Sequence, residues 1–141
     1  MIYTYKNSTE WLGEHKGHIR MENGVDLDFS APPSMHGIPD VLTPEDSFMA
    51  AINTCYFMMF LWACERFKIS LISLKIEALG KVLENMDKTS IFSEIVLKIK
   101  ITAKDTTEER IKSALKSARK YSLVAESIRA ELTIEPEIEI L

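Results

Sequence analysis

Apolar and polar residues alternate along the first part of the chain, a pattern typical of strands with one face toward a core. Residues 18–22 and 25–29 alternate in this way and are joined by Asn23-Gly24. Asn-Gly between two alternating runs is the strongest short-range signal for a β-hairpin. We therefore predict a hairpin here, preceded by a first strand at residues 1–6 and followed by a loop rich in Pro and Gly at residues 31–40.

Longer alternating runs lie in the second half of the chain. Residues 72–82 and 95–102 alternate around a polar turn at residues 85–89, which predicts a long hairpin with one buried and one solvated face. A last run at residues 132–140 contains Pro136. Because proline has no N–H to give to a neighbouring strand, we expect this run at the edge of a sheet.

Residues 43–66 follow a helical pattern instead. Thr43 is a good N-cap, Pro44 suits the first helical position, and Asp46 can complete a capping box. The apolar side chains wrap most of the circumference, so the helix must be covered on nearly all sides. One domain of 141 residues would struggle to cover it alone, and we expect a second subunit to help.

The same apolar run could be mistaken for a membrane-spanning helix. It is interrupted by Asn53-Thr54 and falls short of the roughly 20 apolar residues that a bilayer requires. The rest of the chain alternates as in a soluble sheet. We expect a core helix and no membrane partner.

Two further helices complete the pattern. Residues 105–109 can cap a helix whose inner face carries Ile111, Leu115 and Ala118, and residues 122–130 read as a short helical segment. Strands and helices are thus segregated along the chain, which favours an α+β fold. We expect a single domain over residues 1–141, with antiparallel sheets packed on a long central helix.

Charge and cysteine content limit the classes of partner and the cellular compartment that we expect. The formal net charge is −4 and Lys and Arg are scattered, which argues against a nucleic-acid partner. The first residues lack a secretory signal pattern, and Cys55 and Cys64 are the two cysteines. We therefore expect a reducing compartment, the cytoplasm by default.

Cys55 is the main candidate for chemistry, and two interpretations of it stay open. It can pack as a small buried hydrophobe, or it can react as a thiolate if a cation or dipole lies nearby. Cys64 lies nine residues further along the helix, on the opposite face and roughly 13.5 Å away along the axis. A disulfide requires Cα atoms within roughly 7 Å, so Cys64 cannot pair with Cys55 while the helix persists.

Glu45 is the second candidate. It can be an ordinary first-turn acid favoured by the helix dipole, and it lies roughly 15 Å before Cys55 along the helix, too far for direct contact. The histidines, at positions 15, 18 and 36, form no metal motif, and no phosphate-binding glycine loop is present. We expect neither a metal nor a cofactor.

The segment from Thr43 to Tyr56 resembles the helix of the OsmC/Ohr family, the osmotically inducible and organic-hydroperoxide-resistance proteins, in which Pro-Glu precedes a cysteine at this spacing. The similarity extends to Trp11 and Gly13 near the start. It also extends to Lys-Tyr-Ser-Leu-Val at residues 120–124, which is similar to the family's Tyr-Cys-Pro-Val element.

This resemblance implies an intertwined homodimer with sites at its interface and thiol-dependent reduction of organic hydroperoxides. A first cysteine attacks the peroxide, a second resolves the sulfenic acid as a disulfide, and an external dithiol reduces the pair. Cys55 matches the first cysteine and Glu45 the glutamate that holds an activating arginine. Ser122 stands at the position of the second cysteine.

The arginine itself is unassigned. The chain has His15 or Lys16 where the hydroperoxide-resistance branch has its arginine, its Pro-rich loop contains none, and strand alternation does not support Arg20. Without a second cysteine, a sulfenic acid on Cys55 must wait for an external thiol or be over-oxidised.

Three functions remain under consideration. The first is peroxide reduction by Cys55 alone with an external thiol. The second is a catalytically inactive relative that binds a small apolar ligand at the dimer interface. Its lining is expected to be Met49, Tyr56, Met59 and Phe60. The third is a structural or interaction module.

Overall fold

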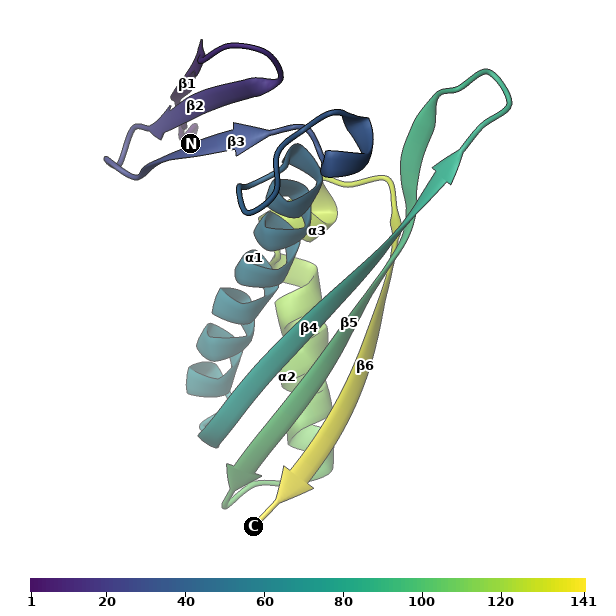
Figure 1. Ribbon diagram of the computed structural model, residues 1–141. Helices are drawn as coiled ribbons and strands as arrows, with labels where there is room; N and C mark the ends of the chain where they lie inside the picture. The colour runs from purple at the N-terminus through teal and green to yellow at the C-terminus, as the bar shows by residue number, and fades with distance from the viewer. The chain divides into compact units, whose positions relative to one another are not determined.

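The computed structural model describes all residues, 1–141. The strands are β1 (Asn7–Trp11), β2 (Lys16–Met21), β3 (Asp26–Ser30), β4 (Ser70–Glu84), β5 (Ser90–Lys104) and β6 (Glu131–Ile140). The helices are α1 (Pro44–Arg66), α2 (Glu108–Tyr121) and α3 (Leu123–Glu126), with a 3-10 turn at Pro33–Met35 (Figure 1). Two compact units, Met1–Phe48 and Met49–Leu141, make up the chain. The expectation of a single domain stays a prediction.

The first unit contains a three-stranded antiparallel sheet in the order β1-β2-β3. The predicted hairpin is confirmed: β2 and β3 are joined through Asn23-Gly24, where Gly24 has a φ of +95° that favours glycine. The prediction of a strand at residues 1–6 is wrong, because the first strand begins at Asn7. Asn7 pairs with Met21, the last residue of β2, and before it only Lys6 continues the pairing, through a hydrogen bond from Glu22 N to Lys6 O at 3.1 Å.

Helix α1 has the predicted limits. Its N-cap hydroxyl, Thr43 Oγ1, accepts a hydrogen bond from Asp46 N at 3.1 Å and donates one to Asp46 Oδ2 at 2.8 Å. The backbone after the helix passes through Lys68 in the left-handed region. Ile69 N donates to Cys64 O at 2.8 Å, which satisfies a carbonyl of the last turn.

The second unit has a three-stranded sheet in the order β4-β5-β6. The long β4–β5 hairpin is antiparallel as expected, but β6 is parallel to β5, so the prediction of antiparallel sheets is wrong for this pair. The reason is the connection: α2 and α3 return the chain to the end at which β5 began, and β6 then runs in the same direction. Pro136 lies on β6, an edge strand, as predicted.

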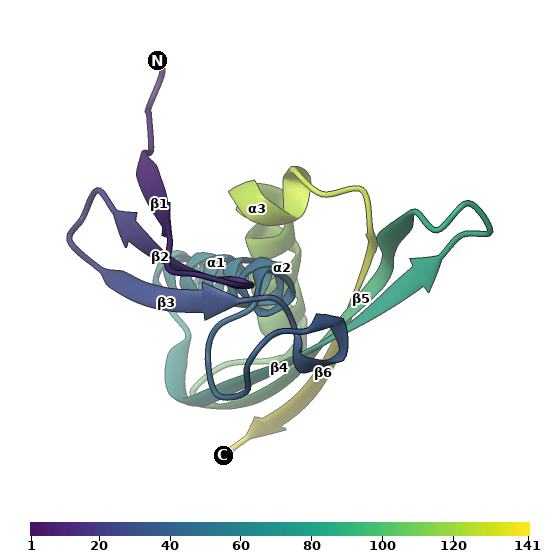
Figure 2. The ribbon, with the colours of Figure 1, turned by 45° about the horizontal axis from the view of Figure 1, so that its top comes forward.

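The core of the second unit lies between the sheet and two helices. The part of α1 in this unit and α2 cover the same face of β4–β6 (Figures 1 and 2). Asn53 Nδ2 donates to Ile76 O at 3.1 Å, joining α1 to β4, and Tyr56 donates to Leu115 O at 3.0 Å, joining α1 to α2. The fully or almost fully buried side chains come from β5, α1 and α2: Ile95, Leu97, Ile99, Ile101, Ala103, Ile52, Tyr56, Phe60, Ile111, Ala114 and Ala118.

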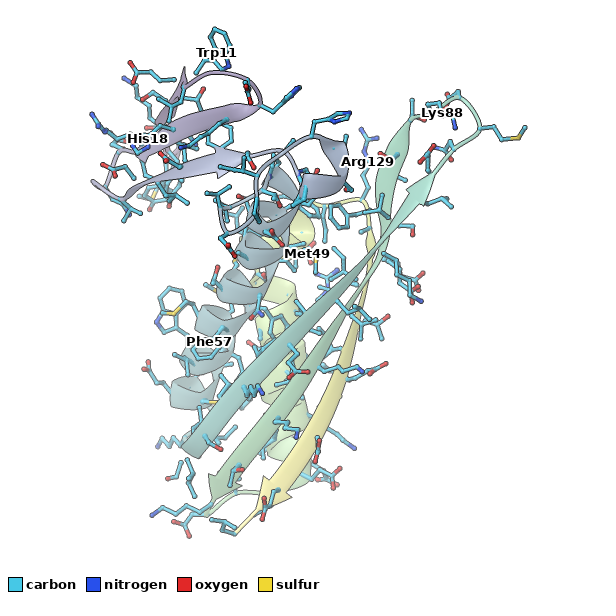
Figure 3. All side chains as sticks on the ribbon, in the orientation of Figure 1. Trp11, His18, Met49, Phe57, Lys88 and Arg129 are labelled. Atoms are coloured by element: carbon cyan, nitrogen blue, oxygen red, sulfur yellow. The ribbon has the colours of Figure 1, made fainter.

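Helix α1 is buried on one face only. Its buried residues are Ile52, Tyr56, Phe60, Ala63 and Cys64. On the other side, Met58 and Trp62 are 45% and 55% exposed. Phe57 points away from the sheet of β4–β6 (Figure 3). By length and apolar content alone the helix would suffice to cross a membrane, a test that soluble core helices also pass.

The β4–β5 hairpin extends beyond the helices of its unit to a tip at Lys88 (Figure 3). Its end carries exposed apolar side chains, at 55% for Val82, 53% for Leu83 and 102% for Met86.

Candidate functional site

Cys55 and Ser122 lie in contact, although they are 67 positions apart in sequence. Ser122 Oγ donates a hydrogen bond to Cys55 Sγ at 3.3 Å. Ser122 is fully buried, whereas Cys55 is partly exposed. The fold therefore brings a buried hydroxyl to the sulfur at the two positions that the family resemblance had paired; their catalytic role stays a prediction.

Ser122 is held by the junction at which it stands. It follows the last residue of α2 and is the N-cap of α3, where its Oγ also accepts from Ala125 N at 3.4 Å. The hydroxyl thus has one donor and one acceptor partner, and its proton is directed to the sulfur. A hydroxyl that donates to sulfur stabilises the thiolate form more than the thiol.

Cys55 lies on the same stripe of α1 as Ala51, Met58 and Trp62, spaced four, three and four residues apart. Ala51, Met58 and Trp62 are exposed. Cys55 is therefore partly exposed beside an apolar surface on one side, and its sulfur accepts a hydrogen bond from a buried hydroxyl on the other.

Cys64 has a different environment on the same helix. It is 3% exposed, and burial, with a contribution from Glu65, raises the pKa of its thiol to about 11. Neither cysteine is in a disulfide. Cys64 therefore packs as a core residue, and at neutral pH its thiol stays protonated.

Charged groups surround the α2–α3 junction in a way that sequence reasoning missed. Arg119 Nη1 lies 2.7 Å from Glu126 Oε1, so this ion pair spans Ser122. The two residues are seven apart, across the end of one helix and the start of another, and the usual i, i+4 pattern within a helix gives no signal for them. The positive charge of Arg119 also acts on Tyr56, where it partly offsets the increase in pKa that burial causes.

Glu45 is exposed in the first turn of α1 and forms no ion pair. Its distance from Cys55 along the helix, roughly 15 Å, prevents direct contact. The basic residues considered for the family's arginine position all lie in the first unit and have partners there. Lys16 pairs with Asp28 at 3.3 Å, Arg20 with Asp26 at 3.7 Å, and the rings of His15 and His36 lie 6.1 Å apart.

The expected ligand lining is only partly accessible. Tyr56 and Phe60 have no exposed surface, while Met49 and Met59 are partly exposed. Tyr56 and Phe60 are therefore core residues of the second unit. The exposed apolar surface of α1 lies around Met58 and Trp62 instead.

Solved structures of similar proteins share this fold at low sequence identity. An OsmC-like protein of unknown function from Vibrio cholerae is 16% identical, with a TM-score of 0.86, and the match covers 96% of this chain and 100% of that one. An organic hydroperoxide resistance protein from Elizabethkingia anophelis is 17% identical, with a TM-score of 0.78 and coverage of 100% and 99%. The protein OhrB of Bacillus subtilis, also an organic hydroperoxide resistance protein, is 19% identical, with a TM-score of 0.66 and coverage of 97% and 98%.

A comparison with curated proteins gave no match. The family model described as OsmC-like protein matches residues 37–137, which include α1, both long strands, α2, α3 and most of β6. This match covers well over half of the chain, and it contains Cys55 and Ser122. The chain belongs to the OsmC-like protein family.

Proposed function

We propose that this protein reduces organic hydroperoxides with Cys55 as its single reacting thiol and an external thiol as reductant. One observation carries the proposal: the buried hydroxyl of Ser122 donates to Cys55 Sγ at 3.3 Å. The thiolate is the nucleophilic form of cysteine, and a hydroxyl donor is the kind of group that stabilises an anionic sulfur. Family membership and the names of the relatives, two of which are hydroperoxide resistance proteins, supply the reaction class.

The first step is a nucleophilic displacement at oxygen. The thiolate of Cys55 attacks the terminal oxygen of the hydroperoxide, the S–O bond forms and the O–O bond breaks. The leaving alkoxide takes a proton and becomes an alcohol. Cys55 is oxidised to the sulfenic acid while the peroxide is reduced.

The second step requires a thiol from outside the chain. Ser122 cannot form a disulfide, and Cys64 is buried on the opposite face of α1. One external thiol therefore displaces water from the sulfenic acid and forms a mixed disulfide. A second thiol attacks that disulfide, which releases the oxidised thiol pair and restores Cys55.

We propose further that the protein works as a homodimer. The support is the exposed apolar surface of α1 at Met58 and Trp62, together with the uncovered hairpin end at Val82, Leu83 and Met86. A second copy is the partner that the family resemblance implies. Multi-angle light scattering at micromolar concentration tests this point, and a monomer contradicts it.

The experiment that tests the reaction is mass spectrometry after addition of one equivalent of cumene hydroperoxide, with dimedone to trap sulfenic acid. We expect the trapped adduct on Cys55 and none on Cys64. Cys64→Ser is the matched control and should react as the parent does, while Cys55→Ser should neither form the adduct nor consume peroxide in the presence of dithiothreitol. Equal modification of the two cysteines, or no reaction, contradicts the proposal.

The alternative function, binding of a small apolar ligand without catalysis, predicts a different result. A fluorescent apolar probe should then bind equally well to the parent protein and to Cys55→Ser, and peroxide should not be consumed. The exposed apolar stripe beside Cys55 is the observation that favours this alternative.

A further inference from the structure

The junction between α2 and α3 is closed by one ion pair. Arg119 Nη1 and Glu126 Oε1 are 2.7 Å apart. Their contact is the one hydrogen bond between side chains that joins the two helices. Arg119 precedes Ser122 by three residues and Glu126 follows it by four. The chain between them therefore forms a closed loop with Ser122 near its middle.

Backbone hydrogen bonds and burial also hold this loop: Ala125 N donates to Ser122 Oγ at 3.4 Å, Glu126 N donates to Ser122 O at 3.0 Å, and Ala125 is 2% exposed. Helix α3 has four residues, Leu123–Glu126, and a helix of one turn is not stable by itself. Its remaining contacts are local: Ser127 Oγ donates to Leu123 O at 2.8 Å and Ser127 N to Val124 O at 3.0 Å. The Arg119–Glu126 pair adds the side-chain contact that ties the end of this short helix back to α2, beside Ser122.

Two other cations of α2, Lys120 and Lys112, have other partners. Lys120 lies with its ammonium 5.2 Å from the centroid of the Tyr121 ring. Lys112 pairs with Glu108 at 3.2 Å, in the first turn of α2 and far along the helix from Ser122. Arg119 is more enclosed than Lys112, with 38% of its side chain exposed against 59%.

The charge of Arg119 also acts at the contact between α2 and α1. Its effect is registered at Tyr56, the neighbour of Cys55, whose hydroxyl donates to Leu115 O one turn before Arg119 on α2. Arg119 thus has a geometric link to Ser122 and acts electrostatically on the Tyr56 hydroxyl, which joins α1 to α2.

We infer that Arg119, held by Glu126, is a positioning residue that fixes the Ser122 hydroxyl on Cys55 Sγ. The inference rests on the proposed function in that Cys55 is the reacting thiol. It goes beyond that proposal by assigning a role to a pair of residues on α2 and α3. Loss of the pair frees the junction, the hydroxyl leaves the sulfur, and the thiolate loses its donor.

The test is the pH profile of iodoacetamide alkylation of Cys55 in the full chain, followed by mass spectrometry. We expect Ser122→Ala to slow alkylation at pH 7 by about tenfold, because a hydrogen bond to a charged group is lost. Arg119→Leu and Glu126→Gln should also slow alkylation at pH 7. Arg119→Lys, which keeps the charge, should retain most of the rate of the parent protein. Lys112→Leu, which breaks the other ion pair of α2, should leave the profile unchanged.

A double-mutant cycle decides whether Arg119 acts through Ser122. In a Ser122→Ala background, Arg119→Leu should have little further effect on the alkylation profile. An unchanged profile in Arg119→Leu and Glu126→Gln overturns the inference, as does a full effect of Arg119→Leu when Ser122 is already absent. Glu126 is 58% exposed, so Glu126→Gln keeps the test decisive even where Arg119→Leu disturbs folding.

Failure of the inference and failure of the proposed function are separable, because alkylation needs no peroxide. A protein that shows the expected shifts but consumes no peroxide supports the positioning role and contradicts the proposed reaction. If the protein consumes peroxide but the Arg119 and Glu126 variants keep the parent alkylation profile, the proposed reaction is supported and the positioning role is contradicted.

Discussion

A second thiol placed at Ser122 should bond to Cys55, and the stabilisation that results can be worked from the structure. In Ser122→Cys the new sulfur replaces an oxygen that lies 3.3 Å from Cys55 Sγ. A disulfide requires about 2.05 Å between sulfurs, so the side chains must approach by roughly 1.3 Å through small rotations. The bond would close a loop of 67 residues. Chain-entropy arguments then give about 4 kcal/mol of stabilisation, reduced by any strain in the native state.

The assay compares oxidised and reduced Ser122→Cys by urea unfolding. One equivalent of cumene hydroperoxide should convert the variant to a form lighter by two hydrogens, with both residues protected from alkylation. Its free energy of unfolding should exceed that of the reduced form by about 2–4 kcal/mol. The increase should disappear when dithiothreitol is added.

Ser127→Cys is the matched control, since Ser127 Oγ bonds to Leu123 O and has no contact with Cys55. It should gain neither the disulfide nor the stability. If Ser122→Cys keeps two free thiols under oxidation, or if Ser127→Cys forms the bond as readily, then Ser122 and Cys55 are not neighbours in solution. The geometric basis of the proposed site would then be wrong.

Three further outcomes follow from single groups of the fold. Burial raises the pKa of Cys64 to about 11, so stability that is fully present below pH 9 should be lost as pH rises through 11, and Cys64→Ala should flatten this dependence in urea unfolding. Tyr56→Phe removes the hydrogen bond to Leu115 O and should cost about 1 kcal/mol by the same assay. Gly37→Ala puts a Cβ against the backbone oxygen of Ala31, where there is no room for it, and should cost about 3 kcal/mol, measured as a lower Tm.

Local signals in the sequence predicted most elements of the fold. Thr43, Pro44 and Asp46 defined the start of α1, because capping depends on neighbouring residues only. Asn23-Gly24 defined the β2–β3 hairpin for the same reason. The direction of β6 was not predictable in this way. Parallel or antiparallel pairing depends on the end of the sheet to which α2 and α3 bring the chain, and the alternation of apolar and polar residues is the same in both cases.

The site was predicted in part. Periodicity and helix geometry separated Cys55 from Cys64, but only resemblance to a family connected Cys55 with Ser122, 67 positions away. Arg119 and Glu126 were missed because their pairing depends on the angle between two helices. Glu45 was selected by resemblance, and its position in the first turn of α1 brings it no charged partner.

The two cysteines differ because nine residues of helix separate them by two and a half turns. The same offset that prevents a disulfide turns Cys64 into the core and Cys55 toward an open apolar stripe. With a pKa of about 11, Cys64 holds roughly one part in ten thousand as thiolate at pH 7. Cys55 has a hydroxyl donor and access from outside. Under the proposed function, thiol chemistry begins at Cys55, and because its hydrogen-bonded neighbour is a serine, we expect the external thiol that completes the cycle to approach across the exposed face of α1.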